Sequence, residues 1–151
     1  MKENQRFGIY IERTFKKIIS TYQQVFRDNN IDLTIEQWVI LQRIDTLGQN
    51  ASQAEIANTS YRNRATTSRV IEGLRKKHLI KKERFDGDLK RYKLVLTSKG
   101  HEAYKEALPL VETLRTIGHQ KISQEKFDIL IEVLDQIWEN YDQAEVMADN
   151  D

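Results

Sequence analysis

One stretch decides the fold of this chain, and it reads, over residues 52–100, SQAEIANTSYRNRATTSRVIEGLRKKHLIKKERFDGDLKRYKLVLTSKG. Ser52 followed three residues later by Glu55 is typical of a capping box, which opens a helix. A short helix is therefore predicted from Gln53 to about Thr59. A polar turn follows, and Asn63 is suited to cap a second helix that runs to about Lys77.

The second helix has two different faces. The residues that recur at helical spacing and are predicted to be buried are Thr67, Val70, Ile71 and Leu74. The residues left on or near the outer face of its first turns are Arg64, Thr66, Ser68 and Arg69. Two short helices joined by a turn, the second one basic at its start, form a helix-turn-helix.

A β-hairpin is predicted directly behind the second helix. Leu79–Phe85 and Tyr92–Leu96 both have strand composition, and Asp86-Gly87-Asp88 is a turn signal between them. The tip of this hairpin is expected to carry Lys90 and Arg91. A helix-turn-helix followed by a hairpin is a winged helix, so the sequence predicts a mainly α fold with a small β wing.

Further amphipathic helices flank this unit. They are predicted over about 4–27, from a second capping box at Thr34 to near Gly48, from Thr97 to Gly118, and from Ser123 onward. Pro109 lies inside the third of them, which predicts a kink or a restart there. We expect a single domain over 1–151, with an N-terminal dimerisation helix (4–30), a winged helix-turn-helix lobe (33–97) and C-terminal dimerisation helices (98–146).

The long outer helices carry more apolar surface than a compact winged helix needs for its own core. The economical partner for that surface is the same surface of a second chain, which predicts a homodimer. The alternative is a monomer that folds its ends back on itself. Two helix-turn-helix units related by a two-fold axis suit a pseudo-palindromic DNA site with half-sites about one turn apart.

The charge of the chain is unevenly distributed. Residues 60–100 contain thirteen Lys and Arg against four Asp and Glu, whereas the remaining residues contain eleven against nineteen. A basic block that coincides with a helix-turn-helix and its wing is the electrostatic pattern of a DNA-binding lobe. The alternative is a solvated lysine-rich surface with no partner.

Composition gives little support for catalysis or cofactor chemistry. Cysteine is absent, which excludes disulfides and thiolate-ligated zinc. His78, His101 and His119 are far apart, and no hydrolase or phosphate-binding motif is present. Acidic pairs such as Glu102 with Glu106 fit a solvated helix face. We therefore expect no enzyme activity, no cofactor, no metal site and no membrane span, and a cytoplasmic location.

Six short pieces of the sequence occur in a characteristic order and spacing: Leu33-Thr34-x-x-Gln37, Glu55-Ile-Ala57, Thr66-Thr-Ser-Arg69, Leu74-Arg-Lys-Lys77, Asp88 and Leu96-Thr-Ser-Lys-Gly100. In these pieces the chain resembles the MarR family of winged helix-turn-helix transcriptional regulators over nearly its whole length. Two positions depart from the family pattern. Lys90 stands where the family wing usually has Arg, which replaces a forked donor by a point charge. His78 stands where the family usually has Gly after the second helix, so that helix end is expected to differ by a residue or two.

The residues and the resemblance together assign roles. Arg64 and Arg69 are candidates for base or phosphate contacts, and Thr66 and Ser68 for shorter-range donation. Arg62, Lys90 and Arg91 are expected at phosphate or in the minor groove. The DNA-binding candidates are thus Arg62, Asn63, Arg64, Thr66, Ser68, Arg69, Lys90 and Arg91, with Asn63 favoured as a helix cap over a base reader. The resemblance implies that Asp88 holds a wing cation.

The resemblance also implies a small-molecule effector, often aromatic or anionic, that controls a homodimeric repressor on double-stranded DNA. The aromatic residues that could line its pocket are Phe7, Tyr10, Tyr22 and Trp38, although core packing explains an aromatic stripe equally well. Two other functions stay open. A winged helix that binds an acidic protein would show no preference among duplexes, and a small-molecule or enzymatic domain would not bind DNA.

Overall fold

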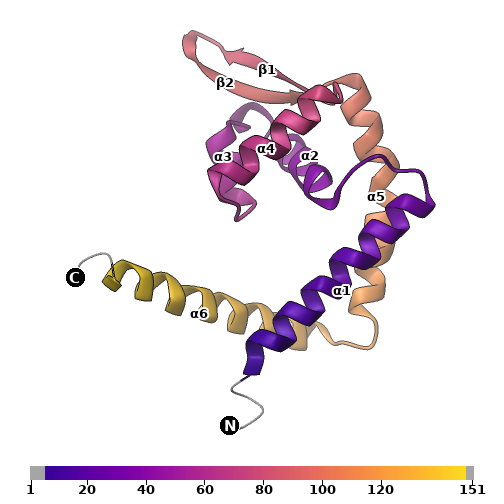
Figure 1. Ribbon diagram of the computed structural model, residues 1–151, viewed down its shortest axis with the longest axis vertical. Helices are drawn as coiled ribbons and strands as arrows, with labels where there is room; N and C mark the ends of the chain where they lie inside the picture. The colour runs from indigo at the N-terminus through magenta and orange to yellow at the C-terminus, as the bar shows by residue number, and fades with distance from the viewer. Residues whose placement is uncertain (1–5, 149–151) are drawn as a thin grey trace. The chain divides into compact units, whose positions relative to one another are not determined.

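The computed structural model describes residues 6–148, with the side chains of 146–148 excepted. In chain order the elements are α1 (Phe7–Asp28), α2 (Ile35–Leu47), the 3₁₀ turn η2 (Gly48–Asn50), α3 (Gln53–Thr59), α4 (Arg64–Lys76), β1 (Ile80–Phe85), β2 (Asp88–Leu96), α5 (Ser98–His119) and α6 (Gln124–Ala148). Figure 1 shows the β1–β2 hairpin beside α4. The predicted mainly α winged helix is confirmed. The predicted start of the first helix at Asn4 lies outside the described residues.

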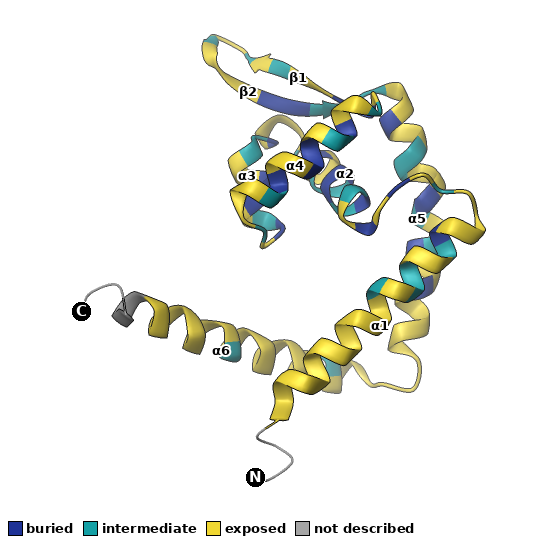
Figure 2. Cartoon of the chain, viewed as in Figure 1, coloured by how far each residue is buried: buried dark blue, intermediate teal, exposed yellow. Residues whose placement is uncertain are grey.

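The chain divides into two compact units, with the boundary between Leu114 and Arg115 inside α5. The first unit contains the helix-turn-helix, the wing, α1 and most of α5. Its core is formed by the last turns of α1, by α2, α3 and α4, by the base of the wing and by the inner positions of α5. In Figure 2 the buried positions are concentrated on these elements, while the first half of α1 is exposed. The core therefore positions the helix-turn-helix and leaves apolar side chains of α1 uncovered.

Side-chain caps fix where the helices begin. Thr34 and Gln37 form the full predicted capping box at α2, with both reciprocal bonds present. At α3 only half of the predicted box forms. The Ser52 hydroxyl accepts from the Glu55 N–H at 3.2 Å, but the Ser52 N–H donates to the Asn50 carbonyl. In a full capping box the Ser52 N–H would donate to the Glu55 side chain, but here it is already bonded to the last residue of the turn η2.

The helix predicted over residues 97–118 is continuous across its proline. α5 runs from Ser98 to His119 with Pro109 inside it, so of the predicted kink or restart the restart does not occur, and the helix ends one residue beyond the predicted Gly118. A proline within a helix removes one backbone donor. Pro109 is exposed, as is Lys105, whose carbonyl loses that donor, so water can satisfy it.

The end of α4 adopts the conformation that the family's glycine would have given. His78 has φ of 58°, and its N–H donates to the Arg75 carbonyl at 2.9 Å. The Leu79 N–H donates to the Leu74 carbonyl at 3.0 Å, which completes a Schellman motif. The expected displacement of the helix end is small, because α4 ends at Lys76, one residue before the predicted Lys77.

Replacing His78 with glycine is expected to stabilise the protein by about 1 kcal/mol. An L-residue in the left-handed region is strained by about 1–2 kcal/mol, and glycine removes that strain while it adds some entropy to the unfolded chain. Urea unfolding of the variant measures the difference. Lys76→Gly is the matched control, since it places glycine inside the last turn and is expected to destabilise by about 1 kcal/mol. Equal effects of both substitutions would contradict this account of the helix end.

Candidate nucleic-acid interface

The helix-turn-helix presents its predicted polar residues to solvent. Asn63 precedes α4, and its side-chain oxygen accepts from the Thr66 N–H at 2.8 Å, so it caps the helix as favoured from the sequence. Arg64, Ser68 and Arg69 are exposed and Thr66 is half-buried. Thr67 is fully buried, and its hydroxyl donates to the Asn63 carbonyl at 2.9 Å. The inner and outer faces of α4 are therefore as predicted.

The turn before α4 is held by its own contacts. Arg62 is half-buried, and its guanidinium donates to the Ser60 carbonyl at 3.1 Å. Tyr61 has φ of 53° and is 79% exposed, a combination that was not predicted from the sequence. No motif marks it, because a left-handed tyrosine is not expected from the residue type.

Lys77 ties the end of α4 to two other elements of the first unit. Its ammonium donates to the Asp32 carbonyl at 2.9 Å and to the Gln37 side chain at 3.1 Å. The Lys77 carbonyl accepts from the Lys99 ammonium at 3.1 Å. The α2 capping box, the end of α4 and the start of α5 are thus joined through one residue. A hollow of about 320 Å³ lies beside this junction.

The wing differs from its prediction at the start of each strand. β1 begins one residue later than expected, at Ile80, and β2 begins four residues earlier, at Asp88. Asp88 pairs with Phe85 across the two-residue turn Asp86-Gly87, in which Gly87 has φ of 75°. Lys90 and Arg91 therefore lie within β2 and not in the turn itself.

Asp88 supports the wing through the main chain. Its carboxylate accepts from the Lys90 N–H at 2.9 Å and from the Arg91 N–H at 3.3 Å. It forms no ion pair with a wing cation among the described residues. The implied role of holding a cationic side chain is thus replaced by a role in shaping the backbone that carries Lys90 and Arg91.

The four aromatic residues proposed for an effector pocket do not share one environment. Trp38 is buried in the core and stacks on Tyr104, with ring centroids 5.7 Å apart. Tyr22 is half-buried against the same core. Phe7 and Tyr10 are exposed on the first turns of α1. The hollow beside Lys77 is lined by other residues, including Asp32, Lys99, Glu102 and Glu106.

Features of other functional classes are scarce in the described part of the chain. Over residues 6–148 no group of three or more metal-binding side chains is found. None of the described helices combines the length and the apolar character that a bilayer crossing requires. The basic helix-turn-helix and its wing remain the main candidate for a functional surface.

Fold and surface together define the class of winged helix-turn-helix proteins. Residues 33–92 match the family model described as the MarR family, and the resemblance to that family is thereby confirmed over this segment. No curated protein matches the chain. The solved structures that it resembles include several transcriptional regulators, and they share its fold at low sequence identity.

Three of these structures are informative. The S. aureus MepR–DNA complex aligns with a TM-score of 0.82 at 18% identity, covering 93% of this chain and 99% of that one. A MarR/EmrR family transcriptional regulator from Acinetobacter sp. ADP1 aligns with a TM-score of 0.82 at 17% identity, covering 95% and 99%. Bordetella bronchiseptica BpsR, whose DNA binding is regulated by 6-hydroxynicotinic acid, aligns with a TM-score of 0.72 at 20% identity, covering 87% and 98%.

Proposed function

We propose that the chain is a sequence-specific DNA-binding transcriptional regulator of the cytoplasm. It acts as a homodimer on a pseudo-palindromic operator and represses by blocking polymerase at its own or a neighbouring promoter. The observation that carries the proposal is the outer face of α4, where Arg64, Ser68 and Arg69 are exposed on a helix whose other face is packed into the core. A rigid helix with exposed donors at its start suits the major groove.

Within this proposal the DNA contacts fall into two groups. The start of α4 supplies base and nearby phosphate contacts through Arg64, Thr66, Ser68 and Arg69. The turn and the wing supply backbone or minor-groove contacts through Arg62, Lys90 and Arg91. Asn63 serves the interface by capping α4, because its side-chain oxygen is already bonded to the Thr66 N–H. Base contacts give specificity, while phosphate contacts fix the register.

Exposed apolar faces support the homodimer. On α1, Phe7, Ile11, Phe15 and Ile18 recur at three- and four-residue steps and are all exposed. On α6, Leu130, Ile131, Leu134, Trp138 and Tyr141 do the same, with Trp138 60% exposed. Contiguous apolar surface of this kind marks an interaction site. A second copy of the chain carries the same two faces, so it supplies a partner for both.

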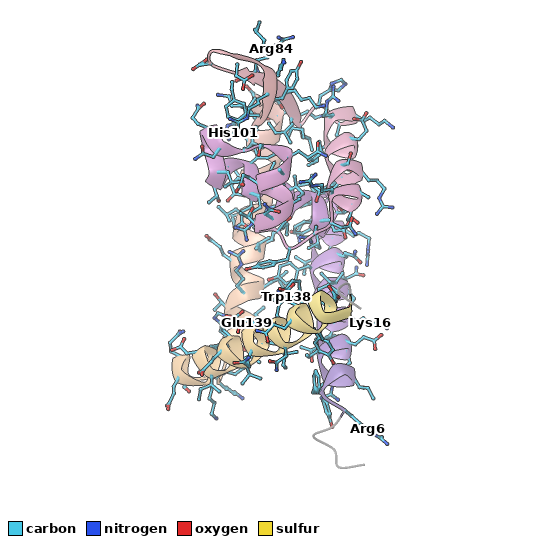
Figure 3. All side chains as sticks on the ribbon, turned by 90° about the vertical axis from the view of Figure 1, so that its left-hand side faces the viewer. Arg6, Lys16, Arg84, His101, Trp138 and Glu139 are labelled. Carbon is cyan, nitrogen blue, oxygen red and sulfur yellow. The ribbon has the colours of Figure 1, made fainter. Side chains whose placement is uncertain are left out.

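Leu130→Lys is expected to weaken dimerisation by about a hundredfold or more, because the substitution buries an unpaired ammonium in an apolar interface. Sedimentation velocity over a concentration series measures the dissociation constant. Glu139→Lys is the matched control, since nine residues further along α6 it lies on the opposite side of the helix. Figure 3 labels Glu139 and the interface residue Trp138 on α6. A monomeric wild type, or equal weakening by both variants, would contradict the proposed interface.

We further propose that a small-molecule effector controls DNA binding. Regulation of BpsR by 6-hydroxynicotinic acid, in a protein of similar fold, supports this. Of the residues considered for a pocket, Phe7 and Tyr10 are accessible, Tyr22 is partly so, and Trp38 could contribute only if the core around Tyr104 opened. An effector that favours a DNA-incompetent arrangement lowers operator affinity, and operator DNA lowers effector affinity by the same factor.

A footprint of the full chain on the DNA upstream of its own coding sequence tests the regulatory proposal. A dimer of helix-turn-helix units is expected to protect about two helical turns of duplex, with two half-sites one turn apart. Transcription in vitro from the same template is expected to fall when the site is occupied. Absence of a discrete footprint together with unchanged transcription would contradict the proposal that the protein regulates its own promoter. An increase in transcription would agree with DNA binding but would show that the protein is an activator and not a repressor.

A further inference from the structure

The wing contains a bulge, and three of its backbone groups bond two side chains. Arg84 pairs with Tyr92 and Phe85 pairs with Asp88, so Leu89, Lys90 and Arg91 have no partner residue on β1. The Asp88 carboxylate accepts from the Lys90 and Arg91 N–H groups. The Arg84 guanidinium donates to the Leu89 carbonyl at 2.9 Å. Bulges of this type re-aim side chains, and here Arg84 holds one side of the bulge.

The wing cations are held in different ways. The guanidinium carbon of Arg91 lies 4.6 Å from the centroid of the Phe85 ring. The guanidinium carbon of Arg84 lies 5.6 Å from the centroid of the Tyr92 ring. No hydrogen bond or ion pair of the Lys90 side chain is found among residues 6–148. Successive β2 residues point to opposite faces, so Arg91 and Tyr92, each with its stacked partner, lie on opposite faces of the wing.

Arg84 lies at the far end of the hairpin together with an exposed apolar side chain. Figure 3 shows Arg84 at the outer end of the wing. Its bond to the Leu89 carbonyl places the guanidinium next to Leu89, whose side chain is 76% exposed. A guanidinium has five donors, so the bond to the Leu89 carbonyl leaves others for a ligand. Arginine together with an apolar tip is a combination that proteins use in the minor groove.

We propose that Arg84 is the forked donor of the wing and that it reads a narrow, A·T-rich minor groove outside each half-site. The proposal rests on the proposed function as a DNA-binding regulator and adds a specificity-determining residue to it. Lys90 lacks the fork, and its ammonium is more strongly hydrated than a guanidinium, so it is less suited to a narrow groove. Arg91 stacks on Phe85 at the opposite face of the wing, whereas the bond to the Leu89 carbonyl holds the Arg84 guanidinium beside the exposed Leu89.

Selection of duplexes from a random library tests the proposal with four full-length proteins: wild type, Arg84→Ala, Arg84→Lys and Lys90→Ala. Wild type is expected to enrich A·T pairs outside each half-site. Arg84→Ala is expected to lose that preference and to weaken binding of the wild-type duplex by about tenfold. Lys90→Ala is expected to keep the preference and to reduce the slope of log affinity against log salt by about one.

Arg84→Lys separates a DNA contact from a structural role. The lysine keeps a donor for the Leu89 carbonyl, so the bulge is retained, but the forked contact is lost. Retained A·T preference in Arg84→Lys would reduce Arg84 to a positioning residue and overturn the proposal. Loss of the preference in Lys90→Ala would also overturn it. If wild type enriches a pseudo-palindrome with no A·T flanks, only the Arg84 proposal fails; if it enriches no duplex, the proposed function fails as well.

Discussion

Replacing Arg69 with alanine is expected to weaken binding of the operator by about 5- to 150-fold, which corresponds to the about 1–3 kcal/mol of a bidentate base contact. Arg69 is exposed on the outer face of α4, whereas the next residue, Val70, is buried in the core. Because Arg69 contributes nothing to the packed face, the variant is expected to fold normally. Fluorescence anisotropy with labelled operator and with random duplex measures both affinities.

The comparison with random DNA is what identifies a base contact. A lost phosphate contact weakens all duplexes alike, whereas a lost base contact weakens the operator more than random DNA. Arg27→Ala is the matched control, because Arg27 is exposed on the last turn of α1 and bonds the Gln24 side chain. Equal loss on both duplexes would place Arg69 at the phosphate backbone. No loss on either would remove it from the interface.

Gly100→Ala is expected to destabilise the protein by about 3 kcal/mol or more. Gly100 is buried in the first turn of α5, where a Cβ atom would lie 2.9 Å from the Leu79 carbonyl carbon and closer still to its oxygen. That carbonyl cannot easily move away, because it accepts from the Thr97 N–H at 3.0 Å. The start of α5 would have to separate from the segment that links α4 to the wing.

Gly118→Ala provides the matched control for this prediction. Gly118 lies in the last turn of the same helix, and a Cβ atom there would meet nothing within 4 Å. Alanine is favoured over glycine in a helix by about 0.8–1 kcal/mol, so this variant is expected to be neutral or slightly stabilised. Thermal unfolding of both variants measures the contrast. A Gly100→Ala protein as stable as wild type would show that α5 and Leu79 do not approach as described.

The helix-turn-helix could be predicted closely from sequence because local chemistry determines it. Ser52 and Asn63 set the first residues of α3 and α4, and each side chain makes the expected capping bond. The burial of Thr67 followed from its spacing with Val70 and Leu74. Capping and helical periodicity act over a few residues, so they are visible in the sequence itself.

The wing and the helix ends were less predictable because they depend on contacts across the fold. The early start of β2 follows from the Phe85–Asp88 pair and from the Arg84 bond to Leu89, neither of which a propensity pattern contains. His78 takes a glycine-like conformation because the Schellman bonds and the Thr97 hydroxyl, which donates to the His78 carbonyl at 2.7 Å, hold it there. Tertiary context overrides residue preference at such points.

The most direct test of the central claim is the selection of duplexes from a random library by the wild-type chain, read together with the spacing of the enriched motif. We expect a pseudo-palindrome whose half-sites lie about 10–10.5 base pairs apart, as required by two α4 helices related by a two-fold axis. Enrichment of no motif, with all duplexes bound alike and with a steep salt dependence, would contradict it. The basic lobe would then be a surface for nonspecific DNA or for an acidic protein.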